Sequence, residues 1–235
     1  MNPGRLERME ANDAREHQSS KGWIILVAIF YLVWAIRATV LYPIDKSIES
    51  EAMAILYSQT IGIALWIVPV FLYLKLADKT SPLEYLKLTT RLRRAIESAM
   101  LIAVYFISVW TIENLMAGKS LFQVRSVGEA LSLKVLLLLP LAPIAEEIFF
   151  RGFVLRKFGE RAAFWKANIA TSLLFVVIHW PYWLYAGGFQ MERGRDSAGI
   201  FLLGCFLGFL VRRTDSLWPA VVAHSLNNFI AMFLR

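Results

Sequence analysis

The stretch that decides the fold of this chain is VLLLLPLAPIAEEIFFRGFVL, residues 135–155. It combines the apolar composition of a membrane span with an acidic pair, Glu146 and Glu147. An α-helix needs about 20 predominantly apolar residues to cross a bilayer. A charged side chain in hydrocarbon costs roughly 2.5–3.5 kcal/mol even on the most lenient scale, so such side chains usually face a polar cavity and mark function. The chemistry of the protein is therefore expected at this pair.

The composition extends the membrane assignment to the rest of the chain. Of its 235 residues, 57% are hydrophobic and only 18% are charged, which is too apolar for a soluble domain. Apolar segments of spanning length recur near 22–42, 53–75, 95–117, 133–155, 164–186, 197–211 and 217–234. The pattern predicts an all-α fold, a polytopic membrane helical bundle of about seven transmembrane helices.

Charge and composition divide the chain into three predicted parts. Residues 1–21 are polar and of mixed charge, and they are expected to form a disordered tail. Residues 22–117 hold the first three predicted transmembrane helices, and residues 130–235 hold a core of four. The single cysteine, Cys205, can form no intrachain disulfide and is expected to pack as a small apolar residue.

Basic residues predict the orientation in the membrane. Most of the 25 Lys and Arg residues lie before the first predicted span or after the second, fourth and sixth. By the positive-inside rule, the chain is expected to be a multi-pass protein of the cell membrane with a cytoplasmic N-terminus and an external C-terminus. Topology and anionic lipid of the bilayer account for the net charge of +7, so no nucleic-acid partner is predicted.

Helical spacing separates the roles of the two glutamates. Glu147 and Arg151 are four residues apart and share one helix face, where a buried ion pair would neutralise both. Glu146 points about 100° away from Glu147 because the helix has 3.6 residues per turn. One carboxylate is therefore predicted to be structural, and the other is free to handle a proton.

Two histidines occupy predicted spans at a similar depth. His179 follows Phe175 by one turn, and His224 precedes Asn228 by one turn, so each pair shares a helix face. At about 1.5 Å per residue, Glu146 and both histidines lie roughly 15–20 Å below the same surface. Unpaired polar faces at one depth cannot all meet lipid, so these groups are expected to converge on one cavity.

Three motifs in sequence order carry a family resemblance. They are EExxxR at 146–151, FxxxH at 175–179 and HxxxN at 224–228. Together they resemble the CAAX-protease and bacteriocin-processing family of intramembrane proteases. The resemblance covers residues 130–235, and the three preceding spans contain no motif that we assign.

The resemblance implies a membrane-embedded endopeptidase of the glutamate type. Glu146, with His179, would be the general base that activates water, and His224 and Asn228 would donate hydrogen bonds to the oxyanion. Glu147, together with the structural ion pair to Arg151, would keep the site in shape. The implied substrate is a protein or peptide with a membrane-associated cleavage site, lipidated in some members of the family.

Three alternatives stay open at this point. Glu146, His179 and His224 also form a His₂Glu set of the kind that binds Zn²⁺ with an open fourth position. However, the HExxH helix of many zinc proteases is absent, which favours a mechanism without a metal or other cofactor. A non-catalytic immunity or scaffold protein and a proton-coupled transporter are the other two alternatives.

Overall fold

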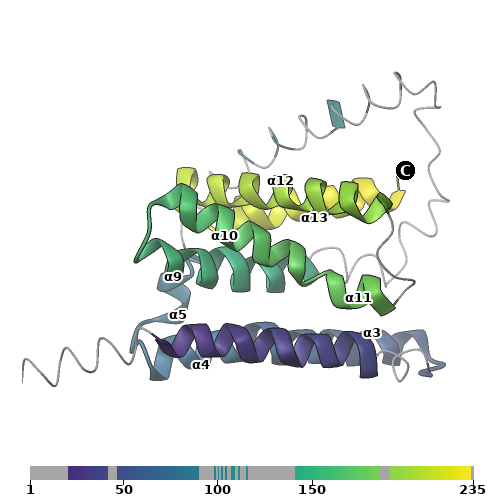
Figure 1. Ribbon diagram of the computed structural model, residues 1–235, viewed down its shortest axis with the longest axis horizontal. Helices are drawn as coiled ribbons and strands as arrows, with labels where there is room; N and C mark the ends of the chain where they lie inside the picture. Colours follow the sequence, from purple (N-terminus) through teal and green to yellow (C-terminus); the bar gives the residue numbers. More distant parts are fainter. Residues whose placement is uncertain are drawn as a thin grey trace, which may run out of the picture.

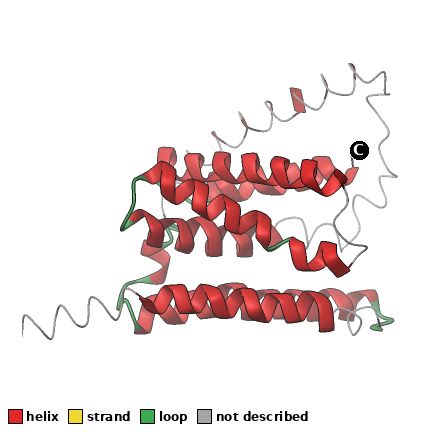
Figure 2. Cartoon of the chain, in the orientation of Figure 1, coloured by secondary structure: helices red, strands yellow, loops and turns green. Residues whose placement is uncertain are grey.

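The computed structural model describes residues 21–41, 47–89, 141–185 and 191–233, together with separate positions between 98 and 115. All regular structure in this part of the chain is helical (Figure 2), which confirms the predicted all-α bundle. The predicted tail, residues 1–21, lies outside the described residues except for Lys21.

Two rods form one layer of the bundle. The first is the helix 21–36 and its π-helical continuation η1 (Arg37–Leu41). The second runs through α3 (Glu51–Gly62), η2 (Ile63–Ile67) and α4 (Val68–Leu76). The two rods lie along the bottom of Figure 1.

The next rod carries the acidic pair. The helix 141–147 passes into the π-helix η3 (Ile148–Val154) and then into α9 (Leu155–Gly159). The short helix α5 (Pro82–Tyr85) leads from the first layer toward α9 in Figure 1.

Four further helices complete the described bundle. They are α10 (Phe164–Val177), α11 (Trp180–Tyr185), α12 (Met191–Thr214) and α13 (Trp218–Phe233). In Figure 1, α12 and α13 form the layer farthest from the first two rods, and α10 crosses between.

Length and composition identify several membrane-spanning candidates. Within the described residues, four helical segments are long and apolar enough to cross a bilayer: Lys21–Leu41, Gln59–Leu76, Phe164–Tyr185 and Asp196–Thr214. Outward-facing side chains such as Ile25 and Leu32 are 58% and 63% exposed, as expected of a surface that meets lipid. The predicted spans 95–117 and 133–155 lie partly outside the described residues, so the total of seven stays a prediction.

An aromatic cluster joins the first layer to η3. The ring of Phe30 lies 4.0 Å from that of Phe149, centroid to centroid, and 4.7 Å from that of Trp66. Trp66 in turn lies 5.9 Å from Phe150. Such rings bury a large area and favour tilted or edge-to-face contacts, so this cluster fixes the acidic segment against the N-terminal rods.

Small residues bring α10 and α12 close together. The amide of Asn168 donates from Nδ2 to the backbone oxygen of Cys205 at 2.8 Å. A Cβ atom at Gly208 would collide with the Oδ1 atom of Asn168, so this close approach requires glycine. The small residue Gly208 therefore serves helix packing between α10 and α12.

Candidate active site

The acidic pair lies where a regular helix becomes π-helical. Glu146 and Glu147 end the helix 141–147, and all seven residues of η3 after them are buried. The Glu147 side chain is fully buried, whereas that of Glu146 is 23% exposed. Departures from α-helical geometry of this kind often occur at functional sites. The two carboxylates therefore have different environments, as the helical spacing predicted.

Glu147 is the hub of a buried polar network. Its Oε1 atom accepts a hydrogen bond from Arg151 at 2.9 Å, which is the ion pair expected at this spacing. The same oxygen lies 2.8 Å from Nδ1 of His224, on α13. Because a carboxylate only accepts, Nδ1 of the imidazole is the donor in this contact. The sequence reasoning missed this second partner of Glu147.

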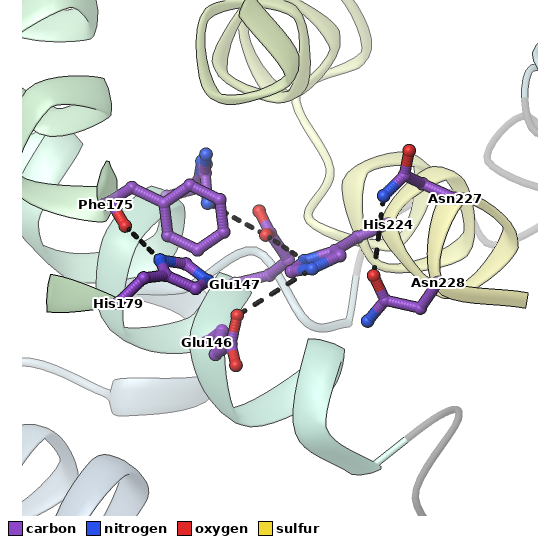
Figure 3. Close-up of polar contacts among 8 residues, drawn as sticks. Glu146, Glu147, Phe175, His179, His224, Asn227 and Asn228 are labelled. Carbon is purple, nitrogen blue, oxygen red and sulfur yellow. Dashed lines mark hydrogen bonds and ion pairs between the residues drawn. The ribbon is translucent and has the colours of Figure 1, made fainter. Parts of the chain in front are cut away.

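The other ring nitrogen of His224 faces Glu146. Its Nε2 atom lies 3.7 Å from Oε2 of Glu146, and Figure 3 shows the imidazole between the two carboxylates. This separation is too long for a direct hydrogen bond, but it is within the reach of groups that share one water molecule. The structure therefore brings together both glutamates and His224.

His179 occupies a break in the predicted span 164–186. Residues 178 and 179 form a turn between α10 and α11. The break has a local cause: Pro181 lacks a backbone N–H, so it cannot donate to the oxygen four residues earlier. Nδ1 of His179 donates to the backbone oxygen of Phe175 at 2.9 Å. This bond fixes the orientation of the imidazole, with Nε2 pointing away from the Phe175 backbone.

Phe175 packs against three polar side chains of the site. Its ring centroid lies 5.3 Å from that of His179 and 5.6 Å from that of His224, with both pairs close to perpendicular. The guanidinium carbon of Arg151 lies 4.3 Å from the same centroid, in the range of a cation–π contact. The phenylalanine of the FxxxH motif therefore orients the site, although it supplies no reacting group.

A cavity of about 300 Å³ lies beside the two histidines. Asn228 lines it from α13, and Asn227 adjoins with Nδ2 3.5 Å from the Asn228 Oδ1 atom. Asp196 and Ile200 of α12 form part of the opposite wall. The spacing of the HxxxN motif gave no role to Asn227, which nevertheless lines the same cavity.

Glu146 lines a second cavity, on the side of the N-terminal rods, and not the cavity beside the two histidines. This cavity has a volume of about 200 Å³, and Trp34, Arg37 and Trp66 contribute to its walls. Arg37 is only 9% exposed. The rods without a recognised motif therefore reach the acidic pair, which no pattern in their sequence indicated.

The described residues contain no group of three or more His, Cys, Asp or Glu side chains that could hold a metal ion. The three ligands of the zinc alternative, Glu146, His179 and His224, are neighbours in Figure 3 but do not form such a set.

The fold and site define a helical membrane protein with a buried carboxylate–histidine centre. A family model described as type II CAAX prenyl endopeptidase Rce1-like matches residues 128–230, which include all three motifs. This match confirms the family resemblance predicted from the motifs, and the family is one of proteases. Comparisons with curated proteins and with solved structures found no match.

Proposed function

We propose that this protein is an intramembrane endopeptidase that hydrolyses a peptide bond in a membrane-associated or lipidated protein or peptide. The proposal rests mainly on one observation, the 3.7 Å separation between Oε2 of Glu146 and Nε2 of His224, whose ring lines the cavity beside the two histidines. A water molecule held between these atoms would lie next to a bound peptide. The family match supports the same class of reaction.

Glu146 is the proposed general base. It is the more exposed carboxylate, and the ion pair of Arg151 is with Glu147 and not with Glu146. In the proposed reaction Glu146 takes a proton from water as the water oxygen attacks the scissile carbonyl carbon. It returns that proton to the amide nitrogen as the carbon–nitrogen bond breaks. His179 would hold the same water through Nε2, because its Nδ1 atom is bonded to the backbone of Phe175.

His224 and Asn228 are the proposed oxyanion donors. Glu147 accepts from Nδ1 of His224, so Nε2 is the ring atom that faces the reacting groups and, as an N–H donor, would bond to the oxyanion. Asn228 has an amide group at the wall of the same cavity. Donors held in place before the reaction stabilise developing charge more effectively than mobile water does.

The proposed location is the cell membrane, with a cytoplasmic N-terminus and an external C-terminus. A reporter fused after Arg213 should therefore be cytoplasmic, and one fused after Arg235 should be external. A reversed signal at either position would contradict this orientation.

The decisive experiment replaces Glu146 with glutamine, which keeps the shape and removes the basic oxygen. Glu84→Gln, on the exposed helix α5, is the matched control. Terminal-peptide proteomics of cells that carry each variant would identify a substrate, and a purified assay would then measure its cleavage. Glu146→Gln should reduce the rate by about 10²–10⁴-fold at unchanged thermal stability. Wild-type turnover by this variant would refute the proposal.

The same assay tests the absence of a cofactor. Enzyme that is stripped of metal and shown to contain none should keep full activity if Glu146 acts on free water. Loss of activity that Zn²⁺ alone restores would instead assign Glu146, His179 and His224 as ligands.

A further inference from the structure

A third cavity lies at the opposite end of α10 from His179. Its volume is about 500 Å³, and it is bounded by the end of α9, the start of α10 and the end of α12. Arg156 and Arg212 are its two outer cations, while Arg151 forms its inner wall toward the candidate active site. None of the roles proposed above involves the two outer arginines.

The acidic residues of this cavity already have cationic partners outside its walls. Glu160 accepts from Lys157 at 3.1 Å and from the hydroxyl of Tyr85 at 2.7 Å. Asp215 forms an ion pair of 3.3 Å with Lys87. Lys157 also pairs with Asp78 at 2.7 Å, so among the described residues four cations (Arg156, Arg212, Lys87 and Lys157) face three carboxylates (Glu160, Asp215 and Asp78), which leaves an excess of positive charge.

Arg156 and Arg212 supply that excess. Among the described residues, neither guanidinium has a carboxylate oxygen within ion-pair distance, and the buried Nε atom of Arg156 has no hydrogen-bond partner. The Arg212 guanidinium lies 4.3 Å from the ring centroid of Phe164, which orients its planar face. Burial lowers the pKa of Arg156 more than the charges of Tyr85 and Asp215 raise it. An anion in this cavity would offset that cost.

The start of α10 adds a second attraction for an anion. Its N-cap residue, Ala163, makes no side-chain capping hydrogen bond, and Ala162, Phe164 and Ala167 line the cavity. The first backbone N–H groups of a helix have no partner within the helix and carry the positive end of its dipole. Such groups beside arginines match the geometry of a phosphate oxyanion.

We infer that this cavity binds a phosphate group, held by Arg156, Arg212 and the start of α10. The cavity opens at the end of the bundle where the basic connectors gather, which is the level of lipid headgroups. The phosphate belongs either to an anionic lipid or to a soluble ion. The inference does not depend on the proposed protease activity.

Binding to the full-length protein tests the inference with two probes. In one arm, the protein is reconstituted in nanodiscs of phosphatidylcholine with and without phosphatidylglycerol, and native mass spectrometry counts the lipid retained on release. In the other arm, inorganic phosphate is titrated into the detergent-solubilised protein while its melting temperature is followed. The test variant is the double substitution Arg156→Gln and Arg212→Gln. The control is Arg213→Gln, which is matched to Arg212→Gln because it removes one positive charge from the same turn without altering the cavity lining.

Each arginine that is removed should weaken phosphate binding at least tenfold relative to wild type, because a charge-assisted hydrogen bond contributes about 1.5–3 kcal/mol. The double variant loses both contributions. Arg213→Gln should bind like wild type. Retention of phosphatidylglycerol without an effect of inorganic phosphate assigns a lipid, and the converse assigns a soluble ion. Equal binding by all three proteins, or equal loss in both variants, overturns the inference. Arg212→Gln alone, at an exposed position, keeps the test available if the double variant does not fold.

Discussion

The two ends of this chain satisfy their buried polar groups in different ways. At the centre of the region that contains the motifs, a buried side chain bonds to two other side chains, as Glu147 does to Arg151 and His224. In the first rod, two side chains donate instead to the backbone of another helix. The Tyr31 hydroxyl donates to the Leu174 oxygen at 2.5 Å, and the Trp34 indole nitrogen donates to the Ile178 oxygen at 3.0 Å.

These two backbone oxygens are on either side of the segment where α10 ends and the chain turns through His179. The Leu174 oxygen also accepts from the backbone N–H of Ile178 at 3.1 Å, so the Tyr31 hydroxyl adds a second donor at the end of α10. The first rod thus ties down the backbone at this helix end. The region without a recognised motif therefore holds the backbone that carries a proposed catalytic histidine, and the motif region supplies the reacting groups.

The largest effect on stability is expected within the motif region, at Glu147. Glu147→Gln leaves Arg151 as a buried cation without its counter-charge and weakens the support of His224. Removing one partner of a buried ion pair costs about 3–5 kcal/mol. Thermal or denaturant unfolding in detergent should show this loss, whereas Glu146→Gln should unfold like wild type. Equal stability of the two glutamine variants would mean that the carboxylates are not divided into a structural and a reacting group.

The next largest effect is expected on activity, at Asn228. Asn228→Ala removes a proposed oxyanion donor, which typically costs about 10²–10³-fold in kcat. The matched control is Asn227→Ala, one residue earlier on α13 and lining the same cavity. We expect the control to lose less activity, since it has no proposed contact with the oxyanion. Equal losses in both variants would assign the effect to the shape of the cavity instead of to hydrogen bonding.

A smaller effect is expected where α10 meets α12. Gly208→Ala should destabilise the protein by about 1–3 kcal/mol, because the added methyl group forces Asn168 away from its place. Gly194→Ala, on the same helix with open space around its Cβ position, is the control. The difference in melting temperature between the two variants measures how closely α12 packs against α10. Equal melting temperatures would contradict the close packing.

Local sequence spacing predicted the parts of the site that lie within one helix. The Glu147–Arg151 ion pair joins residues four apart, and the same spacing placed Phe175 and His179 on one face, although it did not predict the bond from His179 to the Phe175 backbone. The fixed helical period makes such pairs readable without a structure. The three motifs likewise indicated the family resemblance that the family model supports, because they preserve short spacings.

Contacts between distant segments could not be predicted in this way. Glu147 and His224 are separated by 77 positions, and their contact depends on how η3 and α13 pack. The turn at His179 had a local signal in Pro181, although the span 164–186 was predicted without a break. Tyr31 and Trp34 are common residues for a membrane helix, so nothing in their spacing indicated that they bond to α10.

The smallest expected effect tests the first rod directly. Trp34→Phe keeps most of the aromatic packing but removes the indole N–H that bonds to Ile178, and Tyr31→Phe removes the hydroxyl that bonds to Leu174. Each lost hydrogen bond should cost about 0.5–1.5 kcal/mol of stability. Hydrogen exchange should rise at residues 178–183, and kcat should fall several-fold at unchanged KM, because His179 would no longer be held in one position. Trp165→Phe, at a ring that is 56% exposed, is the control and should change neither. The double variant Tyr31→Phe/Trp34→Phe is measured in the same way. If its hydrogen exchange and its kcat equal those of this control, the first rod does not position His179, and the motif region orders its own site.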